Sequence, residues 1–364
     1  MKHAIVITAY ILVSSTSAYP ADGAFIDKNG VSHMPSAEIP YSDLASKQQR
    51  EQFITDAQRR AGQPKKPMPR LTKEIVQHIN DARNQEAKER IANLNKLFNV
   101  TTTASKIGGV PVYVSTPKDG IAPDNRDLVL IQLHGGSFLG NSGPLAQVAA
   151  VPIAGLGKIK VVSVDYRQAP AYQYPAATRD VESVYKSLMR DYRPAHVGIF
   201  GCSTGALLTA EATAWIHHSG LPAPGAIGLF GEGALVNAGD SYYGSNIFTG
   251  TVTSLPRGAV PLESGLYFPD SRVTKDGLAF PAEKPEIIKN FPPTLLISGT
   301  RDAGLSQIVV THARLVKAGV TADLHVWEGA THCAYASAGG TGVPENREAW
   351  NVMVNFFRKH LHRQ

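Results

Sequence analysis

The sequence predicts an α/β fold with a mostly parallel, twisted central sheet flanked by helices. From about residue 107 onward, short runs rich in Val and Ile alternate with helical stretches. Such alternation implies crossover connections, which join parallel strands. The runs LVLIQL at 128–133 and TLLIS at 294–298 are apolar throughout, as is typical of strands buried on both faces of a sheet.

The expected elements follow in chain order. Strands are predicted at Val110–Ser115, Leu128–Leu133, Lys160–Val164, Val197–Phe200, Ala226–Phe230, Thr294–Ser298 and Leu324–Trp327. Helices are predicted at Pro144–Gly155, Ala176–Arg190, Thr204–His218, Ser306–Ala318 and Glu345–His360. Residues 231–290 interrupt the alternation with Gly, Pro, Ser and Tyr, which predicts an insertion contributing to a cap within a catalytic domain of residues 107–364.

The N-terminal part has a different texture. Residues 19–106 are polar and contain two expected helices, at 42–60 and 71–98, separated by Pro64, Pro67 and Pro69. Neither helix has an apolar stripe wide enough to form a core alone. We therefore expect residues 19–106 to be a helical cap or extension lying against the larger body.

The first residues resemble a secretory signal peptide. Lys2 precedes ten apolar residues, 4–13, and small residues lead to an expected cleavage site near Ala18. The alternative is a buried N-terminal strand. The apolar run is too short to span a bilayer, and no later stretch reaches that length. We therefore expect a secreted or periplasmic protein that is not an integral membrane protein.

Composition and charge argue against a nucleic-acid partner. The chain of 364 residues is 43% hydrophobic and 18% charged, which is typical of a globular protein. Its 36 basic and 30 acidic residues give a formal net charge of +6, without a dense basic block. A solvated surface explains this excess better than a nucleic-acid site does.

The segment Gly201–Gly205 (GCSTG) carries the first chemical signal. It follows the expected strand ending at Phe200 and precedes the expected helix beginning at Thr204. A G-x-S-x-G sequence in a strand–turn–helix context is typical of a turn that exposes a nucleophilic serine, here Ser203. The helix N-terminus would favour developing negative charge beside it. The alternative is that Ser203 only caps the helix.

A second signal is the segment His134–Phe138 (HGGSF), which follows the strand 128–133. Paired glycines let backbone N–H groups approach a substrate oxygen, and acyl transfer needs such donors for its oxyanion. We assign this role to the amides of Gly135, Gly136 and Thr204. The alternative is a tight turn with no ligand.

Asp302 and His332 complete the expected constellation. Each follows a predicted strand, and the chain order Ser, Asp, His is the one found with this type of serine turn. His332 would act as general base, and Asp302 would orient it and stabilise its charged form. The competing groups are the acids Asp270, Asp276 and Glu328 and the histidines His217, His312 and His325.

These motifs together resemble the hormone-sensitive-lipase-like, bacterial carboxylesterase branch of the α/β-hydrolases. The resemblance covers roughly residues 107–362 and rests on HGGSF (134–138), VVSVDYRQAP (161–170), YPAATRD (174–180), GCSTG (201–205), PPTLLISGTRD (292–302) and His332. It implies an α/β-hydrolase fold with a helical cap. The chain departs from the family pattern at Ser137, Cys202, Thr204, Gln168 and Ala171.

The two cysteines flank expected catalytic residues, since Cys202 precedes Ser203 and Cys333 follows His332. A similar arrangement in tannase and feruloyl-esterase relatives is bridged. That resemblance implies a Cys202–Cys333 disulfide formed after export. The alternative is two buried free thiols.

The resemblance implies hydrolysis of short- or medium-chain carboxylic esters through an acyl-enzyme, with no cofactor and no metal. His217 and His218 lack the spacing and the partners of a metal site. A lactonase, or a hydrolase of extracellular polyesters or acetylated polymers, is the alternative enzyme. A non-catalytic binding protein on the same fold is the alternative of another class. The acyl and alcohol groups and the oligomeric state stay open.

Overall fold

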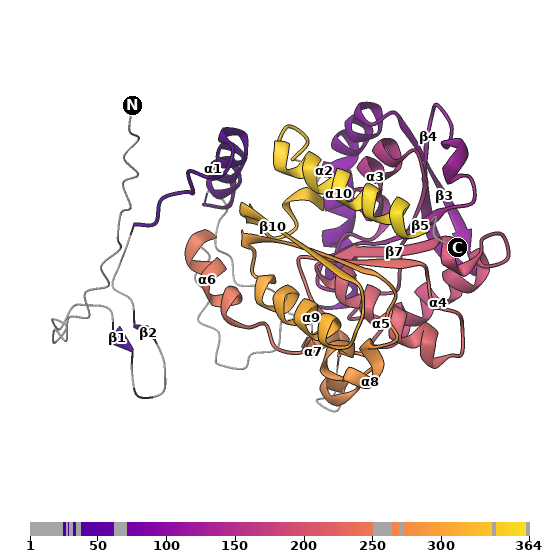
Figure 1. Cartoon of the computed structure of the whole chain (residues 1–364). Coiled ribbons are helices and arrows are strands. Elements are labelled where there is room, and N and C mark those ends of the chain that lie inside the picture. The colour runs from indigo at the N-terminus through magenta and orange to yellow at the C-terminus, as the bar shows by residue number, and fades with distance from the viewer. Residues whose placement is uncertain are drawn as a thin grey trace, which may run out of the picture. The chain divides into compact units, whose positions relative to one another are not determined.

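The structure is a computed structural model, shown in Figure 1, that describes residues 25–26, 28, 32–33, 38–61, 71–249, 264–268, 273–336 and 340–361. The chain divides into two compact units, Met1–Tyr41 and Ser42–Gln364. In the first unit, strand β1 (Phe25–Ile26) pairs antiparallel with β2 (Ser32–His33). The predicted signal peptide and its cleavage site lie outside the described residues.

The second unit is built on an eight-stranded sheet with the order β10-β9-β8-β7-β5-β6-β4-β3. All neighbouring strands from β10 to β6 are parallel, whereas β4 pairs antiparallel with both β6 and β3. The strands are β3 (Val100–Ile107), β4 (Val110–Pro117), β5 (Val129–Leu133), β6 (Lys160–Val164), β7 (Val197–Cys202), β8 (Ala226–Phe230), β9 (Thr294–Arg301) and β10 (Ala322–Thr331). The predicted mostly parallel sheet is confirmed.

Helices cover both faces of this sheet (Figure 1). Helices α3 (Ala150–Gly157) and α10 (Pro344–Leu361) pack on one face; α4 (Ala176–Leu188), α5 (Thr204–His218) and α9 (Leu305–Lys317) pack on the other. Every residue of β5, β7 and β8 is buried, because each of these strands lies between two layers of helices. The carboxyl ends of these central strands lead into the loops that carry the candidate site.

Strand β3 was not predicted from the sequence. Its residues, VTTTASKI, are mostly exposed and polar, so it lacks the apolar run that marks the central strands. It forms a hairpin with β4, in which Ile107 pairs with Val110 across Gly108 and Gly109. Both glycines have positive φ, 58° and 82°, as two-residue hairpin turns require. The sheet therefore begins before residue 107.

The predicted helix 144–155 was also partly wrong. The structure has a 3₁₀ turn at Gly143–Gln147 and then α3 at Ala150–Gly157. Pro144 begins the first piece, and Pro152 falls in the first turn of the second, where its missing N–H costs no helical hydrogen bond. The prolines thus mark two helix starts.

Two N-terminal helices belong to the second unit. Helix α1 (Lys47–Ala61) is tied to the body by Gln49 Nε2, which donates to the Glu328 carbonyl at 2.6 Å. Helix α2 (Lys73–Leu97) begins after Thr72, whose hydroxyl accepts from the N–H of Ile75, and it buries residues such as Ile91 and Leu94. The division of residues 19–106 from the catalytic domain stays a prediction.

The predicted insertion contains short helices where the structure describes it. These are α6 (Asp240–Thr249), α7 (Ser264–Tyr267) and α8 (Pro285–Ile288). Its role as part of a cap stays a prediction. Among the described helices, none is both long and apolar enough to cross a membrane.

Candidate active site

Ser203 lies in the sharp turn between strand β7 and helix α5. Its backbone has φ 59° and ψ −135°, a conformation that few non-glycine residues adopt and that is typical of functional sites. The turn requires glycine on both sides, since a Cβ at Gly201 would collide with the Gly205 carbonyl, and one at Gly205 would collide with the Leu133 carbonyl. The Ser203 side chain makes no capping hydrogen bond to helix α5, which removes the alternative that it only caps the helix.

The structure brings Ser203, His332 and Asp302 together. His332 Nε2 lies 2.9 Å from Ser203 Oγ, and His332 Nδ1 lies 2.7 Å from Asp302 Oδ1. The Asp302 side chain is fully buried, whereas that of His332 is 41% exposed. An imidazole between a buried carboxylate and a hydroxyl can accept the hydroxyl proton and hold the resulting charge. Ser203 can therefore act as the nucleophile and His332 as the general base, with Asp302 orienting His332.

Further donors hold the Asp302 carboxylate in place. The Gly304 N–H donates to Oδ1 at 2.8 Å, and the Ser298 hydroxyl donates to Oδ2 at 3.0 Å. Both oxygens therefore have a fixed donor in addition to His332. Ser298 was not singled out from the sequence. It lies inside strand β9, and the chain turns at the end of this strand, where the Asp302 N–H donates to the Gly299 carbonyl, so that the Asp302 side chain reaches Ser298.

The competing acids and histidines lie elsewhere. Asp276 accepts from the Tyr174 hydroxyl, and His312 Nε2 lies 3.3 Å from the Ala322 carbonyl. His325 stacks on Trp327 in strand β10, and His217 lies on the exposed end of helix α5. The carbonyl of Glu328 accepts from Gln49. Asp270 lies outside the described residues.

The expected oxyanion loop lies against the nucleophile. A Cβ at Gly135 would be 3.0 Å from the Ser203 Cβ. Gly136 has φ 122°, a conformation that favours glycine. No described residue accepts a hydrogen bond from the N–H groups of Gly135, Gly136 or Thr204. Three donors near one serine hydroxyl can stabilise a tetrahedral oxyanion.

His134 supports this loop from behind. Its ring is buried and stacks on Tyr166, with ring centroids 4.2 Å apart. Burial lowers the pKa of His134, so the ring stays neutral. Its Nδ1 lies 2.8 Å from the Gly135 carbonyl oxygen, to which only a protonated Nδ1 can donate. A neutral imidazole with its proton on Nδ1 therefore holds the carbonyl of Gly135.

Comparisons with known proteins identify the family of this chain. A family profile of the α/β-hydrolase fold matches residues 130–336, more than half of the chain. The chain belongs to the α/β-hydrolase family. The α/β-hydrolase fold that the resemblance implies is therefore confirmed.

Among solved α/β-hydrolases, the crystal structure of an esterase, E25, has a TM-score of 0.74 and 32% identity, and the alignment covers 91% of this chain and 99% of that one. The carboxylesterase/phospholipase LipF of Mycobacterium tuberculosis is 29% identical over 216 residues, 58% of this chain and 57% of LipF. An acetyl-hydrolase of Streptomyces hygroscopicus is 30% identical over 108 residues, 29% of this chain and 36% of that protein. The chain thus covers less than two thirds of both curated relatives.

Two of the residues that depart from the family pattern, Ser137 and Gln168, lie in or beside the oxyanion loop. Ser137 has a positive φ of 59°, the left-handed region that glycine adopts without strain, where a third glycine is usual. Gln168 lies beside the oxyanion loop, with its Nε2 3.4 Å from His134 Nε2. Because His134 carries its proton on Nδ1, its Nε2 can accept from this amide. Gln168 thus favours the same tautomer.

A disulfide joins Cys202 and Cys333, whose Cα atoms are 6.2 Å apart. It links the residue before Ser203 to the residue after His332. The predicted pairing is therefore present in the structure, and the alternative of two free thiols is not. The bridge ties the loop that carries the histidine to the turn that carries the serine.

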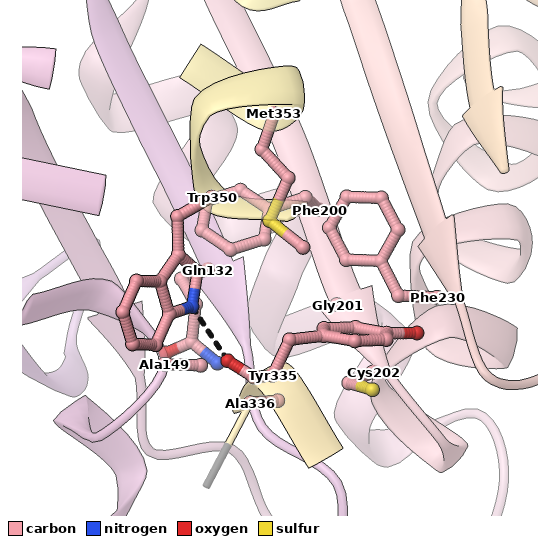
Figure 2. A pocket seen from close by; sticks show the side chains of 10 residues that line it. All are labelled: Gln132, Ala149, Phe200, Gly201, Cys202, Phe230, Tyr335, Ala336, Trp350 and Met353. Carbon is pink, nitrogen blue, oxygen red and sulfur yellow. Dashed lines mark hydrogen bonds between the residues drawn. The ribbon is translucent and has the colours of Figure 1, made fainter. Parts of the chain in front are cut away.

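A small cavity lies behind this turn, on the side of helix α10 (Figure 2). Its walls include Gln132, Cys202, Tyr335 and Trp350, and the Trp350 indole N–H donates to the Tyr335 carbonyl at 2.6 Å. Neither Ser203 nor His332 lines it. The cavity is thus part of the packing beneath the serine turn and not a substrate site. The described residues include no cluster of three or more His, Cys, Asp or Glu side chains suited to a metal ion.

Proposed function

We propose that this protein is a serine hydrolase of carboxylic esters that acts through an acyl-enzyme. The observation that carries the proposal is the hydrogen-bonded series Ser203–His332–Asp302, placed beside the Gly135–Gly136 loop. The esterase and carboxylesterase names of its relatives support the same chemistry. The reaction needs no cofactor.

The proposed reaction has two halves. Ser203 Oγ attacks the ester carbonyl carbon while its proton passes to His332 Nε2, 2.9 Å away. The N–H groups of Gly135, Gly136 and Thr204 stabilise the oxyanion. His332 then protonates the departing alcohol, which leaves an acyl group on Ser203. In the second half, His332 takes a proton from water, which attacks the acyl carbon and releases the acid and the free serine.

Asp302 serves both halves as a carboxylate that neither takes up nor releases a proton. Its Oδ1 accepts the Nδ1–H of His332, so Nε2 keeps the lone pair that receives the serine proton. When His332 becomes charged, the buried carboxylate stabilises it.

Short- or medium-chain acyl groups are the proposed substrates. The acetyl-hydrolase relative supports a short acyl group. Initial rates on p-nitrophenyl acetate, butyrate, octanoate and palmitate test this, and we expect a maximum at acetate or butyrate. A maximum at palmitate would contradict the short-chain assignment. Release of soluble monomers from an acetylated polymer or polyester at a higher rate would favour the polymer alternative.

We also propose that the protein works outside the cytoplasm. The signal-like residues 1–18 and the Cys202–Cys333 disulfide support this, since disulfides persist in oxidising compartments. Expression of the full chain with separation of the periplasmic and extracellular fractions tests it. A mature N-terminus near Ala18 in those fractions is expected, and an intact chain confined to the cytoplasm would contradict it.

A further inference from the structure

Helix α2 fastens the loop that follows the oxyanion residues. Asn80 and Asn84 lie four residues apart, and therefore on one face of the helix. Asn80 Nδ2 donates to the Leu139 carbonyl at 2.9 Å, and Asn80 Oδ1 accepts from the Asn141 N–H at 3.1 Å. Asn84 likewise donates to the Ser142 carbonyl and accepts from the Leu145 N–H. Each amide thus binds a carbonyl and an N–H of the loop.

Asn141 carries this attachment back to the oxyanion loop. Its side-chain Nδ2 donates to the Gly135 carbonyl at 3.1 Å. Its backbone has φ 65°, the left-handed conformation that asparagine tolerates better than most residues. Since Asn80 holds the backbone N–H of Asn141, it also fixes the position from which the Asn141 amide reaches Gly135.

The held carbonyl belongs to the peptide that presents an oxyanion donor. The Gly135 carbonyl and the Gly136 N–H are part of one planar trans peptide, so they point in opposite directions. Asn141 and His134 both donate to the carbonyl oxygen, at 3.1 and 2.8 Å. Fixing the carbonyl from one side therefore fixes the direction of the Gly136 N–H on the other.

A hydrogen-bonded turn follows Gly136, and Asn80 also contacts this turn. The N–H groups of Leu139 and Gly140 both donate to the Gly136 carbonyl, at 2.9 and 2.8 Å. Asn80, which is only 4% exposed, holds the Leu139 carbonyl from outside. Both peptides that flank Gly136 are thus restrained, one by Asn141 and one by this turn.

We propose that Asn80 and Asn141 are positioning residues that orient the Gly136 N–H toward the oxyanion. The relay runs from helix α2 through Asn80 to Asn141, and from Asn141 to the Gly135–Gly136 peptide. The inference rests on the proposed esterase function. Neither asparagine contacts the reacting atoms, so each acts only through the loop it holds.

Two substitutions break this relay at different points. Asn141→Gly removes the donor to the Gly135 carbonyl and tolerates the positive φ, so the backbone need not change. Asn80→Ala removes both the acceptor for the Asn141 N–H and the donor to the Leu139 carbonyl. Asn93→Ala, at an exposed position of helix α2, is the matched control.

The expected signature is a loss in kcat with KM little changed. Loss of a whole oxyanion donor costs about 10²–10³ in kcat, so a misdirected donor in Asn141→Gly should cost about 10–100-fold. Asn80→Ala should cost about 3–30-fold for the same reason. KM for p-nitrophenyl butyrate should stay within about threefold, because ground-state binding does not use the oxyanion.

Inhibition by an alkyl trifluoromethyl ketone distinguishes a misdirected oxyanion donor from general disruption of the fold. It forms a tetrahedral adduct with the nucleophile and so reports on oxyanion stabilisation. Its affinity should fall by the same factor as kcat/KM in both variants and stay at the wild-type value in Asn93→Ala. Thermal unfolding identifies the folded fraction to which each rate is normalised.

The outcomes are distinct. A folded Asn141→Gly with wild-type kcat and wild-type affinity for the ketone would overturn the inference. If Asn141→Gly does not fold, the same two measurements on Asn80→Ala decide, and unchanged values there would overturn it. A wild-type protein that hydrolyses none of the esters would instead overturn the proposed function, and the inference with it.

Discussion

The carboxylate of Asp302 lies 2.7 Å from His332 Nδ1 and is fully buried, while the imidazole is partly exposed. The charge that stabilises a protonated His332 is therefore shielded from water. The Gly304 N–H and the Ser298 hydroxyl fix the two carboxylate oxygens. Orientation of the histidine and stabilisation of its charge both depend on this one side chain.

Asp302→Asn should lower kcat for p-nitrophenyl butyrate by about 10³–10⁴-fold, because the neutral amide no longer stabilises the imidazolium. Steady-state rates at pH 7.5 measure this. Asp276→Asn is the control, since Asp276 bonds to Tyr174 and not to His332, and it should stay within about threefold of the wild type. A larger loss in Asp276→Asn than in Asp302→Asn would contradict the assignment of the acid.

Removal of the disulfide should lower both stability and activity. The bridge spans a sequence separation of 131 residues, so the double variant Cys202→Ala/Cys333→Ala should lose about 2–5 kcal/mol of unfolding free energy. It should also lower kcat, because the loop carrying His332 loses its attachment to the Ser203 turn. Urea unfolding and ester hydrolysis measure the two effects.

Reduction of the wild type provides the control for these substitutions. With dithiothreitol, the wild type should fall to the stability of the double variant, and the double variant should not respond. An unfolding free energy of the double variant equal to that of the oxidised wild type would contradict a stabilising bridge.

The burial of Glu211 leads us to predict that the stability of the protein depends on pH. It is fully buried in helix α5, and burial raises its pKa well above the usual value, opposed by the Thr178 hydroxyl and reinforced by the charges of Glu232 and Asp276. Above the usual glutamate range, the unfolded chain releases this proton while the folded protein keeps it. The unfolding free energy of the wild type should therefore fall as pH rises from about 4.5 toward the raised folded pKa.

Glu211→Gln should remove this slope. Glutamine keeps an oxygen for the Thr178 hydroxyl, which donates to Glu211 Oε2 at 2.9 Å, and it cannot ionise. The variant should be more stable than the wild type at pH 8 and similar to it at pH 4. Urea unfolding at both pH values measures this, with Glu86→Gln, at an exposed position of helix α2, as the control. Parallel pH profiles of Glu211→Gln and wild type would contradict a protonated Glu211.

The sequence was most informative where the physical signal is local. Strands β6 and β8 and helix α5 have the predicted bounds, because apolar runs and a glycine-flanked serine turn mark them directly. The neighbourhood of Ser203 and His332 could be anticipated because both follow strands of a parallel sheet, whose carboxyl ends share one edge.

Features that depend on contacts between residues far apart in the chain could not be predicted from the sequence. Strand β3 is an edge strand with polar residues, and only its pairing with β4 gives it a place in the sheet. Asn80 and Asn141 are 61 residues apart, and asparagine in a polar helix is usually a solvated residue. Their connection becomes visible only when helix α2 lies against the loop.

The most direct test of the proposed function compares wild type and Ser203→Ala. Both proteins are assayed on p-nitrophenyl butyrate and treated with a fluorophosphonate probe, with thermal unfolding to establish that both are folded. The wild type should hydrolyse the ester and be labelled at Ser203, and the variant should lose about 10³-fold or more in kcat and remain unlabelled. Equal rates and equal labelling in the two proteins would contradict the role of Ser203 as the nucleophile.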